Sequence, residues 1–167
     1  SNLAQEFKNL LKGNDGYLKI LISGSVEPIE VKIYEALVNT IEENGFSQIL
    51  EKELKTTEPT SSEVLKLLSK LQDHLAKDSQ FSGIVMVIDE LGKFVQFAGR
   101  NKNQGDLFLL QQLAENTALA HQCSFNLIAM LHQSLDVYAK DLDEETKNEW
   151  KKIQGRFNEI SFIESPE

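Results

Sequence analysis

Four short apolar runs lie along the chain, and each is followed by polar or turn-forming residues. Residues 83–88 (GIVMVI) and 125–131 (FNLIAML) are almost continuously apolar, as is typical of parallel strands that are covered on both faces. Residues 17–23 (YLKILIS) and 160–163 (ISFI) have the composition of strands. We predict four strands, of which the first three are parallel neighbours with residues 83–88 in the middle.

The intervals between these runs carry helical periodicity. After Pro28, a suitable first helical residue, apolar residues recur at every fourth position, at Ile29, Ile33, Leu37 and Ile41. Thr60 and Glu63 have the spacing of a capping box ahead of a helix that extends to about residue 77. The pattern therefore changes from strand to helix after the first apolar run and returns to strand at the second.

The second half of the chain continues this alternation. Residues 92–105 are polar and contain glycines, so we predict a short helix or turn and then a loop. Asp106 can cap a helix over residues 107–121, and a helical pattern over residues 134–153 is interrupted near Asp143. Alternating strands and helices predict an α/β fold, with all 167 residues in one domain and a mostly parallel sheet flanked by helices.

An amphipathic segment precedes the first predicted strand. Residues 3–12 are followed by Gly13, and they place four apolar residues on one helical face: Leu3, Phe7, Leu10 and Leu11. The initial Ser1-Asn2 pair is typical of a cloning remnant, so we expect the natural chain to extend further upstream.

The composition indicates a cytoplasmic globular protein. No apolar run approaches the roughly 20 residues that span a bilayer, and no secretory signal pattern is present. The single cysteine, Cys123, cannot form an internal disulfide, which fits a reducing compartment. The net charge of −9 disfavours a broad nucleic-acid surface, although a local basic patch or a neighbouring domain could supply one.

Asp89 and Glu90 follow directly after residues 83–88. Ligands of parallel α/β sheets collect at the carboxyl ends of the strands, where this acid pair is expected to lie. A carboxylate there can hold Mg²⁺, usually through water, and a neighbouring glutamate can orient or polarise an attacking water. The alternative is that Asp89 caps the next helical turn.

Two further features accompany the acid pair. Residues 125–131 are followed by His132, Gln133 and Ser134, polar side chains that could sense a γ-phosphate, and Arg156 precedes the last predicted strand. In this order, GIVMVIDE resembles a Walker B strand, LIAMLHQS resembles a sensor-1 strand, and Arg156 occupies the place of an arginine finger. The chain thus resembles a P-loop ATPase of the AAA type. The segments IDELGKF, LHQS and QGRF together look most like the large, poorly characterised bacterial ATPases of that superfamily.

The resemblance covers most of the chain, from the second to the fifth core strand of that fold. It implies that Asp89 contacts Mg²⁺, that Glu90 acts on water, and that His132 and Gln133 contact the nucleotide. It further implies that Arg156 acts in trans. The full-length protein would then bind ATP and Mg²⁺, hydrolyse ATP and work as a homo-oligomer.

One motif of that family is missing. A P-loop has the pattern G-x-x-x-x-G-K-[ST], and its backbone N–H groups cradle the phosphates. Of the nine glycines only Gly92 precedes a lysine, and Val87 and Phe94 stand where the pattern requires glycine and Ser or Thr. We therefore expect an excised portion of a larger ATPase that lacks one central strand, is inactive alone and carries no bound nucleotide. The alternative is a non-catalytic NTPase-like module for interaction or regulation.

The sequence matches the patterns of a nuclease site, a metal site and a cysteine nucleophile less closely. Glu90 and Lys93 are separated by two residues, whereas the corresponding nuclease pattern is Glu-x-Lys. His121, Cys123 and His132 lack the second closely spaced pair of a typical metal site. For Cys123, the sequence favours a core residue over a nucleophile.

Two positions in residues 92–105 could also contact other molecules. Phe94 and Phe97 could mark a partner surface, although helix packing is their default role. Arg100 could contact phosphate, although a solvated loop charge is the commoner arrangement.

Overall fold

The computed structural model describes residues 16–50, 56–77, 81–101, 105–118, 123–133, 137–138 and 142–161. Its centre is a parallel sheet of three strands, β1 (Tyr17–Ser23), β2 (Gly83–Asp89) and β3 (Ser124–Ala129), in the order β1-β2-β3. Gly83 lies opposite Tyr17 of β1 and Ser124 of β3. The prediction of three parallel neighbours with residues 83–88 in the middle is therefore confirmed.

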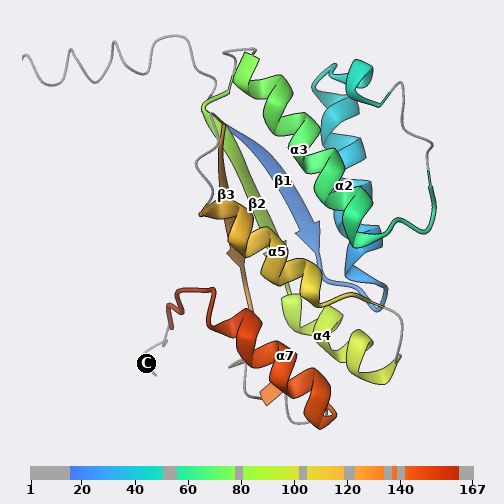
Figure 1. The fold of residues 1–167 in the computed structure, drawn as a ribbon, viewed down its shortest axis with the longest axis vertical. Coiled ribbons are helices and arrows are strands. Elements are labelled where there is room, and N and C mark those ends of the chain that lie inside the picture. Colours follow the sequence, from blue (N-terminus) through green and yellow to red (C-terminus); the bar gives the residue numbers. More distant parts are fainter. Residues whose placement is uncertain are drawn as a thin grey trace, which may run out of the picture.

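Helices follow each strand of the sheet. After β1 come α2 (Ile29–Glu43), the short 3₁₀ helix η1 (Ser47–Ile49) and α3 (Ser61–Lys77). After β2 come α4 (Leu91–Arg100) and α5 (Phe108–Thr117), and after β3 comes α7 (Glu144–Gln154). Helices α2, α3 and α5 lie on the same face of the sheet (Figure 1). None of the described helices combines the length and the apolar character that are needed to cross a membrane.

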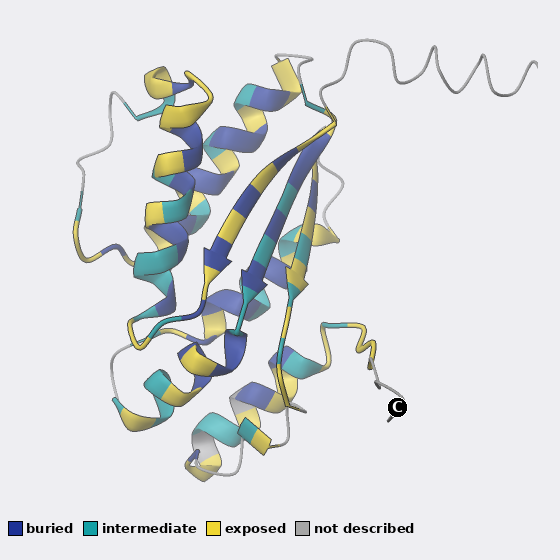
Figure 2. Ribbon diagram, turned by 180° about the vertical axis from the view of Figure 1, so that it is seen from behind, coloured by how far each residue is buried: buried dark blue, intermediate teal, exposed yellow. Residues whose placement is uncertain are grey.

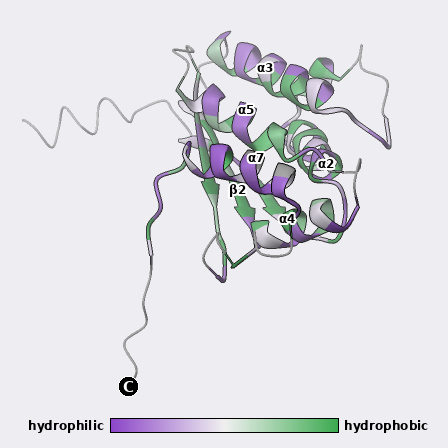
Figure 3. Ribbon diagram, turned by 60° about the horizontal axis from the view of Figure 1, so that its bottom comes forward, coloured by the Kyte–Doolittle hydropathy of each residue, from purple (hydrophilic) through white to green (hydrophobic). Residues whose placement is uncertain are grey.

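The core lies between this face of the sheet and its helices. Alternate residues of β1 and β2 point into it and are at most 4% exposed: Leu18, Ile20, Ile22, Ile84, Met86 and Ile88. The regularly spaced apolar residues of α2 are also buried, as their four-residue repeat predicts: Ile29, Ile33, Leu37 and Ile41. Figure 3 shows β2 in the colours of hydrophobic residues, whereas α7 is largely hydrophilic.

The start of α3 agrees with its capping signal in the sequence, whereas Pro28, predicted as the first helical residue, is the N-cap of α2. The N–H of Thr60 donates to the Glu63 carboxylate at 2.7 Å, and the N–H of Glu63 donates to the Thr60 hydroxyl at 3.3 Å, which confirms the capping box. The Asp143 carboxylate accepts the N–H of Thr146 at 2.9 Å and begins α7. The predicted interruption near Asp143 is therefore the start of a new helix.

The opposite face of the sheet is open among the described residues (Figure 2). Leu21 is 70% exposed and Ile128 is 49% exposed on this face, and Val85 and Val87 of the middle strand are partly exposed. The expectation that helices cover both faces is thus not met within the described part of the chain, where α2, α3 and α5 cover one face only.

The predicted fourth strand is not found among the described residues. Residues 158–161 form no strand, and β3 is an edge strand of the described sheet. Residues 162–163 lie outside the described part, as do the amphipathic segment of residues 3–12 and His121.

Candidate functional site

The acid pair lies at the carboxyl end of the middle strand. Asp89 is the last residue of β2 and lies opposite Ser23 of β1, and Glu90 follows it. The backbone of this turn is fixed from both neighbouring strands: the N–H of Gly24 donates to the Asp89 carbonyl at 2.8 Å, and the N–H of Leu91 donates to the Met130 carbonyl at 3.1 Å. The acids are therefore placed by the sheet rather than by a free loop.

Glu90 has a backbone conformation that is unusual for its residue type. Its φ of 51° and ψ of 42° lie in the left-handed region, and among the described non-glycine residues it is the one with positive φ. For residues with a side chain this region is strained, and such residues often occur at functional sites. The Asp89 carboxylate accepts the N–H of Glu90 at 2.8 Å, a contact with the N-cap residue of α4 and not with the helix itself.

Two side chains contact the carboxylate of Glu90. The Lys93 ammonium donates to it at 2.6 Å, and Nε2 of His132 lies 3.5 Å away. The hydrogen bond from Lys93 holds the pKa of Glu90 below its usual value, with a smaller contribution from His132. Glu90 is consequently ionised at neutral pH. Glu90 and Lys93 are three positions apart, and this helical spacing was the local signal in the sequence for such an ion pair.

Gly24 allows the turn after β1 to contact the acid pair closely. A Cβ added at Gly24 would lie 2.3 Å from the carbonyl oxygen of Glu90. Every residue except glycine would therefore displace either this turn or the turn that carries the acids. No local pattern in the sequence indicates this role of Gly24, because only the three-dimensional structure brings it beside Glu90.

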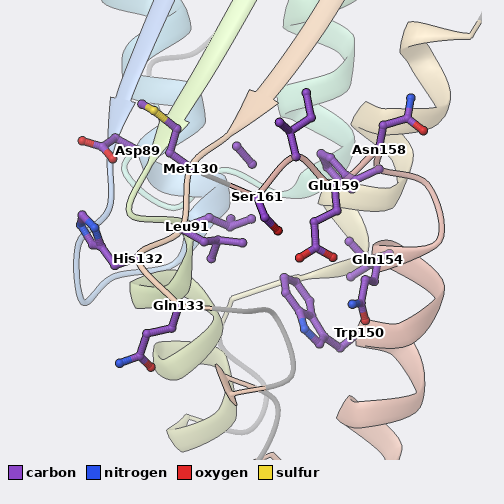
Figure 4. Close-up of a pocket in the computed structure, with 15 residues that line it drawn as sticks. Asp89, Leu91, Met130, His132, Gln133, Trp150, Gln154, Asn158, Glu159 and Ser161 are labelled. Carbon is purple, nitrogen blue, oxygen red and sulfur yellow. The ribbon is translucent and has the colours of Figure 1, made fainter. Parts of the chain in front are cut away.

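A cavity of about 560 Å³ lies next to these turns. Figure 4 shows Asp89 and His132 on one side of it, and Trp150, Gln154 and Glu159 on the other. Its volume is within the range of small-molecule sites, and both polar and apolar residues line it. Trp150, which is 1% exposed, forms part of its apolar wall, a role that no motif in the sequence indicates.

The structure brings most of the predicted site residues together. Asp89, His132 and Gln133 all line the cavity, and Glu90 contacts His132. Arg156 is not part of the lining. Its guanidinium instead pairs with the carboxylate of Glu115 in α5 at 3.0 Å, and both side chains are about half exposed.

The other candidate chemistries find little support. Among the described residues no group of three or more His, Cys, Asp or Glu side chains could hold a metal ion. Cys123 is 3% exposed, and burial raises its pKa, which disfavours a nucleophile. Phe94 is 1% exposed and belongs to the core, so it cannot contribute to a partner surface. Arg100 lies exposed at the end of α4.

Mg²⁺ usually keeps several waters and uses one or two carboxylates together with phosphate oxygens, and Asp89 at the cavity wall is a carboxylate of this kind. Glu90 lies beside it as a second, ionised carboxylate. Comparisons with protein-family models, curated proteins and solved structures found no match to this chain.

Proposed function

We propose that the chain is part of the core of an AAA-type ATPase, in which the acid pair serves nucleotide hydrolysis. The observation that carries the proposal is the placement of Asp89 and Glu90 at the carboxyl end of the middle strand, with His132 and Gln133 following the adjacent strand. This is the edge at which parallel α/β sheets bind ligands. The order of the three strands also agrees with the resemblance seen in the sequence.

The two acids have different environments and so different roles in this proposal. Asp89 lines the cavity and would contact Mg²⁺ through water. The magnesium ion would neutralise phosphate charge. Glu90 is ionised and paired with Lys93, and its lowered pKa makes it a weak proton acceptor at neutral pH. We therefore assign Glu90 to orienting an attacking water by hydrogen bonding rather than to full proton removal.

The described residues contain no phosphate-binding loop, and a neighbouring strand would have to supply one. β3 has no described partner on its outer side, and the cavity extends from the residues after β3 to residues 158–161. An added parallel strand along β3 would end beside the residues that follow β3, such as Gln133, and one strand away from Asp89. A loop after that strand would bring backbone N–H groups to phosphates at this edge.

Calorimetry of Mg-ATP tests the proposal. Residues 1–167 should show no micromolar binding, whereas the full-length protein should bind in the micromolar range. Asp89→Asn in the full-length protein should reduce the magnesium dependence of that binding, and Asp73→Asn, at an exposed position of α3, is a matched control. Micromolar binding by the 167 residues alone would contradict the need for an added phosphate site. Absence of binding by the full-length protein would contradict the proposal itself.

A non-catalytic NTPase-like module is the second candidate. It is favoured by the pairing of Glu90 with Lys93, because this contact gives the acid a structural role without any nucleotide. A full-length protein that binds no nucleotide, but loses stability when Glu90 is replaced, would support this reading.

A further inference from the structure

A tyrosine ring lies against the first turn of α4, next to the acid pair. A Cβ added at Gly92, the second residue of α4, would come closer than 3.0 Å to three ring carbons of Tyr138. Tyr138 follows β3 in the chain and is partly buried against the core. The ring therefore occupies the space that a side chain at position 92 would need, and Gly92 is the residue that admits it.

A second contact of the same kind holds the far end of α4. A Cβ added at Gly99 would come closer than 3.0 Å to Cδ2 of Leu142, which is 4% exposed and precedes the N-cap of α7. Gly92 and Gly99 are seven residues apart, so both lie on one face of α4. Two side chains from the part of the chain between β3 and α7 thus pack on this face, one beside the acids and one about two turns away.

The contact at Gly92 bears on Glu90 because the backbone of Glu90 is strained. Its φ of 51° lies in the left-handed region, and such a conformation persists only where the surrounding structure fixes it. Gly24 lies against the carbonyl of Glu90, and the hydrogen bond from Leu91 to Met130 fixes the next residue. Neither of these two contacts reaches the residue after Leu91, which is Gly92.

We propose that Tyr138 is a positioning residue for the reaction assigned to Glu90, because its ring holds the first turn of α4 and so keeps Glu90 in the left-handed conformation. Lys93 lies in the same turn, and its ammonium contacts the Glu90 carboxylate at 2.6 Å. If this turn moves, the backbone of Glu90 relaxes and its carboxylate leaves its place beside Asp89. The effect on turnover rests on the proposed ATP hydrolysis, whereas the conformation of Glu90 can be measured without it.

Nuclear magnetic resonance of the 167 residues tests the conformation of Glu90 directly. A positive φ brings the amide and α protons of a residue close together, which gives a strong cross-peak between them. Tyr138→Ala should weaken this cross-peak of Glu90, and Tyr138→Phe, which keeps the ring, should preserve it. Leu142→Ala is the matched control, because it removes the similar contact at the far end of α4 and should leave the cross-peak unchanged. An unchanged cross-peak in Tyr138→Ala, or an equal loss in both alanine variants, would overturn the proposal.

Substitution of Gly92 tests the contact itself. In the unmodified protein, Gly92→Ala should lower the Tm by about 3–10 °C, because the new methyl group displaces the ring. In the Tyr138→Ala background the same substitution should leave the Tm unchanged or raise it, since alanine favours a helix more than glycine does. An equal fall of the Tm in both backgrounds would mean that the ring does not occupy this space, and it would overturn the proposal.

Turnover of ATP by the full-length protein measures the consequence for the reaction. Tyr138→Ala should lower kcat at least about tenfold with little change in the KM for Mg-ATP, because it displaces a reacting group and not the bound nucleotide. Tyr138→Phe and Leu142→Ala, assayed well below their Tm, should keep kcat. If the unmodified protein does not hydrolyse ATP, the proposed function fails, and the cross-peak of Glu90 still decides whether Tyr138 positions it. An equal kcat in Tyr138→Ala and Leu142→Ala would overturn the proposal.

Discussion

Gly24 gives the sharpest test of how the acid pair is positioned, and the change to make is Gly24→Ala. The added Cβ would lie 2.3 Å from the Glu90 carbonyl oxygen, whereas ordinary contact begins at 3.4 Å, so the two turns must separate by about 1.1 Å. The obstructing atom belongs to the backbone and cannot rotate away. The separation also stretches the 2.8 Å hydrogen bond from Gly24 to Asp89.

The magnitude follows from these two contacts. Overpacking costs about 1–3 kcal/mol, and a weakened backbone hydrogen bond adds about 0.5–1.5 kcal/mol. We therefore expect the free energy of unfolding to fall by about 2–4 kcal/mol, which lowers the Tm by about 5–15 °C in a domain of this size. Thermal unfolding followed by circular dichroism at pH 7 measures this change.

Gly155→Ala is the matched control for Gly24→Ala. Its backbone is helical, with φ of −64°, and an added Cβ would have only ordinary contacts at 3.6 Å. Its Tm should stay within about 2 °C of the unmodified protein. If Gly24→Ala melts as Gly155→Ala does, the close approach of the two turns is not as described, and the reasoning fails.

Three further predictions follow from individual contacts of the site. Lys93 lowers the pKa of Glu90 in the folded protein, so their ion pair stabilises the fold fully above pH 4.5, the ordinary pKa of the carboxyl group. This stabilisation is lost as the pH falls through the lowered pKa of the folded state. The Tm difference between the unmodified protein and Glu90→Gln should therefore shrink from pH 7 to about pH 3. If this Tm difference is the same at both pH values, the ion pair contributes nothing to stability. Arg156→Ala and Glu115→Gln each remove the same exposed ion pair, which is worth about 0–1 kcal/mol. In the full-length protein only Arg156→Ala should abolish ATP turnover. If the two variants turn over ATP at the same rate, Arg156 has a packing role alone. The buried Cys123 thiol should react with a thiol reagent at least about tenfold more slowly than a free thiol at pH 8, and at the ordinary rate in denaturant; fast reaction in the folded protein would contradict its burial.

The three strands of the sheet and the start of α3 could be predicted because their signals are local. The apolar run of residues 83–88 follows from burial in the middle of a sheet, and Thr60 and Glu63 lie within one turn of each other. The edge at which Asp89, His132 and Gln133 meet could also be predicted, because carboxyl ends of parallel strands lie side by side.

Other features depend on residues far apart in the sequence. The left-handed turn at Glu90 is enclosed by Gly24 and by the hydrogen bond between Leu91 and Met130, and no local pattern indicates it. Arg156 pairs with Glu115, not with the nearby Glu159 that its position would suggest. Coverage of both sheet faces was predicted from the apolar strands, and the described residues provide it on one face only.

Turnover of ATP by the full-length protein, with and without Glu90→Gln, tests the central proposal most directly. Glu90→Gln keeps the shape of the side chain and removes the charge that would orient water. We expect turnover to fall at least about 100-fold while the affinity for Mg-ATP changes little, and Asp73→Asn should leave both unchanged. Full turnover in Glu90→Gln would contradict the account and leave the acid pair with a structural role alone.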